Sequence, residues 1–358
     1  MFICPKDHLF YFSQTHMGKN REKPKNQEKE EKYSISIIPA DFFSLNEIEI
    51  SQRILEIKNY SQHFNPILKN SYVNIGEIDD DGTYKWKEGF EETPDKQENL
   101  MIKRLNIENK PTFYQVFYEK TRETSPRKYV LNLINSYKSL LETAKKLESA
   151  KLINLDFHPS TLVYKEESPS FTDFSSFFHL PTMNEERKSF LFNKYNPKNV
   201  FFPTEAHLIC FLIENKQESV SNSNIEEIVR ETGERVGSLN SFSKDFIEQY
   251  KENTRFSLQS FINKPKQVII QEILLKSPTW NCYGLSIIFI VLLRDIFGPL
   301  SPENKFISQF SQLLTQNIHP LPDKRPTPMQ NISLFNDILY NTDKQEFLNL
   351  FASLSGLL

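Results

Sequence analysis

A chain of 358 residues is long enough to bury a sizeable core, and its 38% hydrophobic and 25% charged residues are typical of a globular protein. The formal net charge of −3 gives no basic excess that would favour nucleic acid or an anionic membrane surface. Only nine residues are glycine, which argues against a glycine-rich phosphate loop. The three cysteines lack CxxC spacing and the start does not resemble a leader, so we expect a reducing, cytoplasmic setting.

The first third of the sequence is dominated by strand-like runs. One helix interrupts them, because apolar residues recur at helical spacing within Leu45–Ile57. Short β-rich runs bounded by polar or turn residues predict the strands, which we expect at Leu9–Ser13, Tyr33–Ile38, Tyr72–Ile78 and Leu100–Leu105.

Helical spacing dominates after Pro111. A wide apolar stripe predicts a helix at Arg127–Leu147, and a nearly all-apolar helix is expected at Trp280–Phe297. Its longest strongly apolar run, Leu285–Leu293, is too short to span a bilayer. One or two further helices are expected within Leu334–Leu354.

The polar region at about 214–264 is interpreted as an insertion, with helical segments at Ile225–Val236 and Phe246–Tyr250. Strands with one helix come first and helices follow. The order predicts an α+β fold of two segregated lobes, divided into residues 1–108 and 109–358.

Two aspartates are the main candidates for functional residues. Asp156 lies within the segment 154–164, and Asp173 follows 17 residues later, in Thr-Asp-Phe-Ser. This arrangement resembles the catalytic loop of protein kinases and the Asp-Phe-Gly motif that follows it. Further segments resemble kinase motifs in the same order along the chain: Tyr33–Ile38, Leu45–Glu47, Phe202–Glu205, Trp280–Leu285 and Asp323–Thr327.

The ordered set covers roughly residues 30–340 and resembles divergent protein kinases of large DNA viruses. The resemblance implies a two-lobed kinase-like fold with a strand-rich N-lobe and a helical C-lobe. It also implies a buried ion pair between Glu205 and Arg325. Asn281 replaces a kinase aspartate that accepts hydrogen bonds from the catalytic loop, and its amide oxygen can still accept them.

The resemblance also assigns roles to five positions. Asp156 would be the catalytic base, and Asp173 a ligand of Mg²⁺. The positions that would bind the cofactor are Glu47 on the helix, Thr161 in place of a second metal ligand, and Ser36 in place of the phosphate-anchoring lysine. From the residues alone, Asp173 also fits a turn residue that binds its own backbone, and Thr161 a packing residue.

The departures from the kinase pattern concern charge. Ser36 cannot supply a cation to phosphates, although Lys32 or Lys103 could replace the lysine in space. Without that lysine, Glu47, or Glu49 in an alternative register, is expected to be a solvated helix residue.

The missing lysine, the replaced second metal ligand and the lack of a glycine-rich loop together predict a pseudokinase that acts by binding proteins. Neither nucleic acid nor a membrane is expected as a partner. The alternative is an atypical Ser/Thr kinase that uses ATP and Mg²⁺ through Asp156 and Asp173. A third reading, from His158-Pro159, is a small-molecule kinase. If the source is viral, the host cytoplasm or the virion is the expected location.

Overall fold

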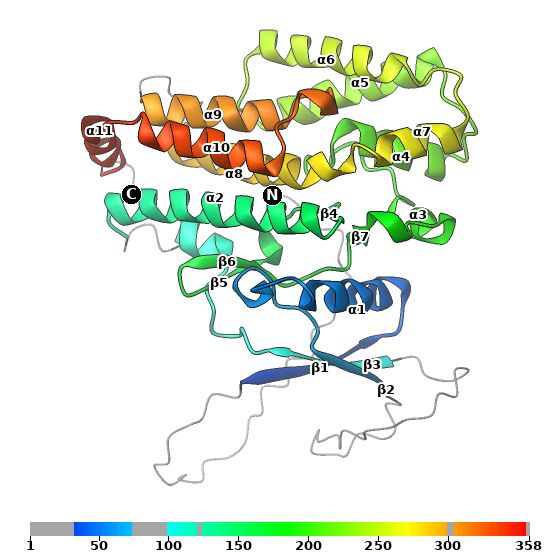
Figure 1. The fold of residues 1–358 in the computed structure, drawn as a ribbon. Helices are drawn as coiled ribbons and strands as arrows, with labels where there is room; N and C mark the ends of the chain where they lie inside the picture. Colours follow the sequence, from blue (N-terminus) through cyan, green and yellow to red (C-terminus); the bar gives the residue numbers. More distant parts are fainter. Residues whose placement is uncertain (1–31, 74–98, 120–123, 299–303, 356–358) are drawn as a thin grey trace. The chain divides into compact units, whose positions relative to one another are not determined.

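A three-stranded antiparallel sheet and one helix form the first part of the described chain. The computed structural model describes residues 32–73, 99–119, 124–298 and 304–355 (Figure 1). The sheet has the order β1-β3-β2, and its strands are β1 (Tyr33–Pro39), β2 (Lys69–Val73) and β3 (Asn99–Leu105).

Two of the predicted strands, at 33–38 and 100–105, are therefore confirmed. The third begins three residues earlier than expected, at Lys69, and its predicted residues 74–78 lie outside the described chain. The strand predicted at 9–13 also lies outside the described residues.

Helix α1 (Phe42–Leu55) packs on this sheet. Asp41 begins it, because its carboxylate accepts a hydrogen bond from the Ser44 N–H at 2.9 Å. The predicted helix is confirmed, but it starts three residues earlier because this cap lies before the apolar repeat. Ile48 of α1 joins Leu100 and Ile102 of β3 in a small buried cluster.

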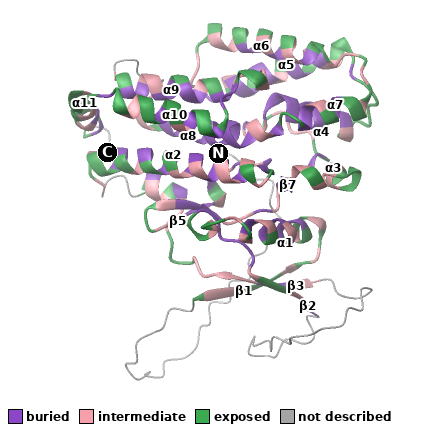
Figure 2. Cartoon of the chain, in the orientation of Figure 1, coloured by how far each residue is buried: buried purple, intermediate pink, exposed green. Residues whose placement is uncertain are grey.

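The second part of the described chain is mainly helical. Helices α2 (Pro126–Ser149) and α8 (Trp280–Phe297) supply the two largest shares of its largest core, and Figure 2 shows α8 as a mostly buried segment. Both helices were predicted within two residues. Gly284 lets α8 approach the loop after β4, because a Cβ atom there would lie 2.4 Å from the Phe157 Cβ.

The remaining helices surround these two. They are α3 (Glu185–Leu191), α4 (Thr204–Glu214), α5 (Asn222–Gly237), α6 (Lys244–Gln259), α7 (Lys266–Leu274), α9 (Lys305–Asn317), α10 (Pro328–Tyr340) and α11 (Lys344–Leu354). The helical segments predicted at 225–236 and 246–250 are confirmed and are longer than expected. The closing region, where one or two helices were predicted, contains two, α10 and α11.

Two short antiparallel ladders were missed by the sequence prediction. The first pairs β4 (Leu152–Asn154) with β7 (Phe177–His179), and the second pairs β5 (Leu162–Lys165) with β6 (Ser168–Phe171). Strands of three or four residues carry too little periodicity to be recognised alone. The class α+β is confirmed, and these ladders position the candidate site.

One described helical stretch, Ser277–Phe297, is long and apolar enough to cross a membrane by length and composition. The sequence prediction considered only the run Leu285–Leu293, which is shorter than this helical stretch. However, 72% of its most apolar window is buried inside the fold, as expected for the central helix of a core. The stretch is therefore weak support for a membrane span.

Candidate functional site

The two ladders bring the backbones beside Asp156 and Asp173 together. In the first ladder Asn154 stands opposite Phe177, and the Leu155 N–H donates to the Ser176 carbonyl at 3.3 Å. Asp156 follows directly on one segment, and Asp173 lies three residues before Ser176 on the other. The backbones of the segments that carry the two aspartates therefore lie side by side.

Helix α8 supports this arrangement through Asn281. The Asn281 side-chain oxygen accepts from the Asn154 N–H at 2.8 Å, and its amide nitrogen donates to the Leu152 carbonyl at 3.1 Å. Asn281 is fully buried. The predicted acceptor role of this asparagine is confirmed, and it fixes the start of the loop that carries Asp156.

Thr161 ends that loop and lies beside the chain that leads to Asp173. Its hydroxyl donates to the His158 carbonyl at 2.7 Å, and its own carbonyl accepts from the Thr172 N–H at 3.0 Å. The hydroxyl thus closes its own turn. This geometry favours a local structural role over the ligation of a second metal ion.

The Asp173 carboxylate is engaged by its own turn. Its Oδ1 accepts from the backbone N–H of Ser175 at 2.9 Å and from the Ser175 hydroxyl at 2.7 Å. Ser175 stands where the motif that this stretch resembles has glycine, and the second of these bonds needs its hydroxyl. No group of three or more His, Cys, Asp or Glu side chains is arranged to hold a metal ion within the part of the chain that the structure describes.

Glu47 is buried and paired, in contrast to the predicted solvated helix residue. Its Oε2 lies 2.9 Å from Nη2 of Arg104, and its Oε1 accepts from the Phe174 N–H at 2.9 Å. The other terminal nitrogen of Arg104 donates to the Thr172 carbonyl at 2.5 Å. Burial raises the pKa of Glu47 more than Arg104 lowers it, and the nearby Asp173 raises it further.

The register of the sheet explains why Arg104 is the partner. On β3, Leu100, Ile102 and Arg104 alternate toward α1. Ser36 stands opposite Ile102 and so shares that face, where it is exposed. Lys103 lies on the opposite face, with its ammonium 4.2 Å from the centre of the Tyr33 ring. It therefore does not supply the cation that the resemblance would place at position 36. Lys32 is an exposed residue just before β1.

The sequence prediction missed Arg104 because no motif marks it. The available signal was the period of two along β3, which places a cation at the end of an apolar face. The sequence did not show which residue of α1 that face would meet.

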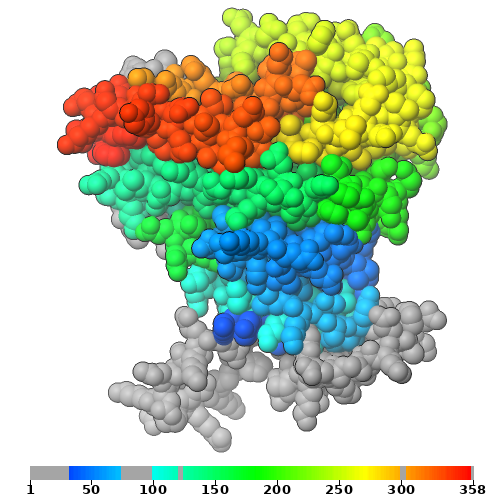
Figure 3. All heavy atoms as spheres, in the orientation of Figure 1, coloured from blue at the N-terminus to red at the C-terminus, as the bar shows by residue number. Residues whose placement is uncertain are grey.

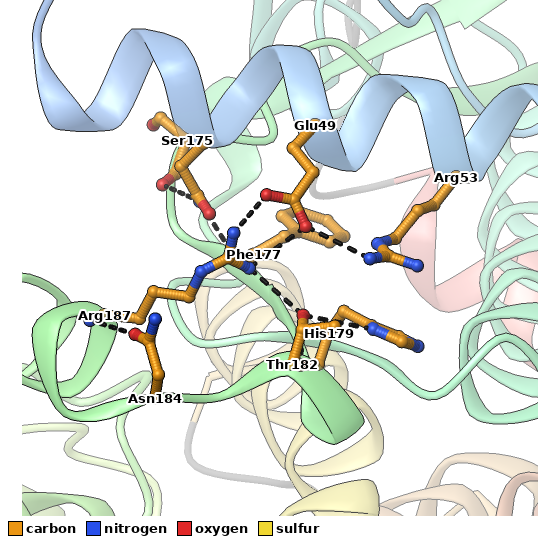
Figure 4. A network of polar contacts seen from close by, with 9 residues as sticks. Glu49, Arg53, Ser175, Phe177, His179, Thr182, Asn184 and Arg187 are labelled. Atoms are coloured by element: carbon orange, nitrogen blue, oxygen red, sulfur yellow. Dashed lines mark hydrogen bonds and ion pairs between the residues drawn. The ribbon is translucent and has the colours of Figure 1, made fainter.

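Glu49, two residues after Glu47 and therefore on another side of α1, forms a different contact. Figure 4 shows its carboxylate between Arg53 of the same helix and Arg187 of α3. Arg187 also donates to the Thr182 hydroxyl at 3.1 Å. The hydrogen bond from Arg187 is the largest cause of a lowered pKa at Glu49. These contacts fasten α1 to the segment that follows β7.

The ion pair predicted between Glu205 and Arg325 is confirmed. Two nitrogens of the guanidinium reach the two carboxylate oxygens at 2.6 and 3.0 Å, and both side chains are almost completely buried. Glu205 also accepts from the Trp280 indole N–H at 2.9 Å. The pair therefore joins α4, the start of α8 and the turn before α10.

Comparison with protein-family models and with curated proteins gives no independent support for a relationship to protein kinases. No protein-family model matches this sequence. None of the curated proteins matches it either.

Proposed function

We propose that this chain is a protein-kinase-like protein that has lost phosphotransfer and acts by binding another protein. One observation carries the proposal: the cation that pairs with Glu47 is Arg104, and its two terminal nitrogens are both engaged within the chain. In protein kinases a sheet lysine pairs with the helix glutamate and reaches the phosphates of ATP. Here Ser36 occupies the position that the resemblance assigns to that lysine.

Two further contacts support the loss of metal-dependent chemistry. Ser175 holds one carboxylate oxygen of Asp173, and the hydroxyl of Thr161 serves the turn at His158. Mg²⁺ requires near-octahedral oxygen ligands, so a ligand oxygen already used twice as a hydrogen-bond acceptor is a poorer starting point. Two of the polar groups that ATP and Mg²⁺ would recruit, Oδ1 of Asp173 and the Thr161 hydroxyl, are thus already used within the protein.

The alternative is an atypical active kinase that binds ATP and Mg²⁺ through Asp173 and uses Asp156 as the base. It is favoured by the adjacent backbones of the segments that hold these two residues. A carboxylate at the position of Asp156 could accept a hydrogen bond from a substrate hydroxyl.

One experiment separates the two proposals. The purified chain is incubated with Mg²⁺ and ATP labelled at the γ-phosphate, with itself and a generic protein as acceptors, beside the Asp156→Asn variant. We expect no transfer above that of the variant, and no Mg²⁺-dependent thermal shift with ATP. Transfer that requires Mg²⁺ and is abolished by Asp156→Asn would establish the active kinase instead.

A further inference from the structure

Apolar side chains gather on the surface where α1 and α3 meet. We call this group the α1–α3 patch, and it consists of Phe42, Phe43, Leu45 and Phe190. The Phe42 ring stacks on Phe190 with the ring centres 4.3 Å apart, and it meets Phe43 edge-on at 5.4 Å. Leu45 follows Phe42 by three residues on α1 and therefore lies on the same side of the helix.

Three members of the patch are substantially exposed. The exposed fractions are 41% for Phe43, 41% for Leu45 and 39% for Phe190. Figure 3 shows the blue surface of α1 directly beside the green surface of α3. Single exposed apolar residues are ordinary, but aromatic residues are enriched at the cores of interfaces, so rings in mutual contact on two elements single out this surface as a candidate.

The patch is held in place by the contacts of Glu49. Arg187, three residues before Phe190 on α3, is paired with Glu49 on α1 (Figure 4). Asn46 adds two bonds from α1, to the carbonyls of Ser175 and Phe177 at 2.9 and 2.8 Å. The two helices thus present a preorganised surface, which lowers the cost of binding.

The size of the patch argues against a stable homodimer. Three side chains exposed by about two fifths offer on the order of 250 Å². A stable dimer buries about 800 Å² on each partner. The patch instead suits a short segment whose two or three apolar anchors lie on one face of a helix.

The charged side chains at the edge of the patch indicate which charge the bound segment carries. Asp41 precedes Phe42, and Glu186 lies one helical turn before Phe190; both are exposed, and neither has an ion-pair partner among the described residues. The basic side chains of α1 and α3, Arg53, Arg187 and Lys188, are all paired with glutamates. In the described part of the chain, the unpaired charges on these two helices and on the cap of α1 are therefore negative.

We propose that the α1–α3 patch binds an amphipathic helical segment of a partner protein that carries apolar anchors flanked by Lys or Arg. This inference rests on the proposed function, since it names the surface and the partner chemistry of a protein-binding fold. It does not depend on whether phosphate transfer survives.

A labelled peptide tests the proposal. The probe is an amphipathic peptide of about 15 residues with leucines on one face and lysines on the other, read by fluorescence anisotropy. Its matched peptide has glutamate in place of each lysine. We expect saturable binding of the lysine peptide and at least tenfold weaker binding of the glutamate peptide.

Variants locate the site. Phe43→Ser with Phe190→Ser should weaken binding at least tenfold, whereas Phe256→Ser should leave it unchanged, because Phe256 is a 68% exposed phenylalanine on α6 away from the patch. The double variant Asp41→Asn/Glu186→Gln should weaken binding of the lysine peptide a few-fold, and the loss should be larger at low salt, where charges are less screened. The asparagine at position 41 still caps α1. Circular dichroism confirms that each variant is folded.

Three results would overturn the inference: no saturable binding of the lysine peptide, equal binding of the glutamate peptide, or equal loss in Phe256→Ser. Dimerisation in the ultracentrifuge that disappears in Phe43→Ser/Phe190→Ser would assign the patch to a second copy and also overturn it. Mg²⁺-dependent phosphotransfer with intact peptide binding would refute the proposed function alone.

Discussion

Arg104 determines how α1 is held against the candidate site. Replacing it by methionine keeps much of the side-chain volume but leaves the Glu47 carboxylate buried without its cation. Side chains in this pair are only 17% and 11% exposed, so we expect a loss of about 3 kcal/mol in the free energy of unfolding. Urea denaturation measures the loss.

A double-mutant cycle tests whether that loss belongs to the pair. Glu47→Gln removes the charge, so Arg104→Met should cost clearly less in that background than in the native chain. Strictly additive effects would contradict the pairing. Arg104→Lys should recover part of the loss, because lysine restores the charge but not the second contact to Thr172.

The two buried ion pairs differ in how far they can be predicted from sequence. Glu205 and Arg325 each stand in a recognisable motif, so their contact could be expected across 120 positions of the chain. Arg104 belongs to no motif. Its contact depends on which face of β3 carries Arg104 and on where α1 packs, and both are set by the tertiary structure. The Ser175–Asp173 turn lies between these cases, since Asp and Ser favour such turns.

Helix α3 is attached to α1 by the Arg187–Glu49 ion pair and by the stack of Phe190 on Phe42, so losing the ion pair should have a local effect. Arg187→Gln removes the charge from a partly exposed pair, so we expect about 1 kcal/mol of local destabilisation. Amide hydrogen exchange of residues 185–191 should become faster. The matched control is Arg230→Gln on α5, whose pair with Glu234 is more exposed and should change exchange little.

Uniform acceleration across α2 and α8 in Arg187→Gln would contradict this prediction, because it would show global rather than local loosening. The attachment itself was not predictable. The sequence placed Glu49 on a helix, but Arg187 lies 138 residues away in a segment without periodicity. Helices with a continuous apolar pattern, such as α8, were found with correct bounds. The three-residue strands beside α3 were missed because their pairing is set by the surrounding fold.

The two parts of the described chain also meet at the turn after α1, where His63 contacts α2. Its Nδ1 lies 2.7 Å from the Thr143 hydroxyl, and that hydroxyl also donates to the Ser139 carbonyl at 2.9 Å. The hydroxyl proton is thus used, so Nδ1 donates to it. Next to His63, Phe64 bridges to Phe171 of the second ladder, which links the sheet region to the candidate site.

This contact should make the stability of the whole molecule depend on pH. Burial, helped by the charge of Lys146, lowers the pKa of His63 from 6.5 to about 4. Between these values the unfolded chain binds a proton that the folded chain does not. Stability is therefore complete above pH 6.5 and falls as the pH drops toward 4. Glu47 acts in the opposite sense, because a raised carboxyl pKa favours the fold at lower pH.

Subtracting a variant isolates the contribution of His63. His63→Gln keeps a side-chain donor for Thr143 but does not titrate. The free energy of unfolding of both proteins is measured by urea denaturation at pH values from 7.5 to 4. The native chain should lose stability relative to the variant as the pH falls below 6.5, with most of the change complete near pH 4. Parallel curves over that range would show that His63 is protonated equally in both states, and the anchoring role of its neutral ring would then be wrong.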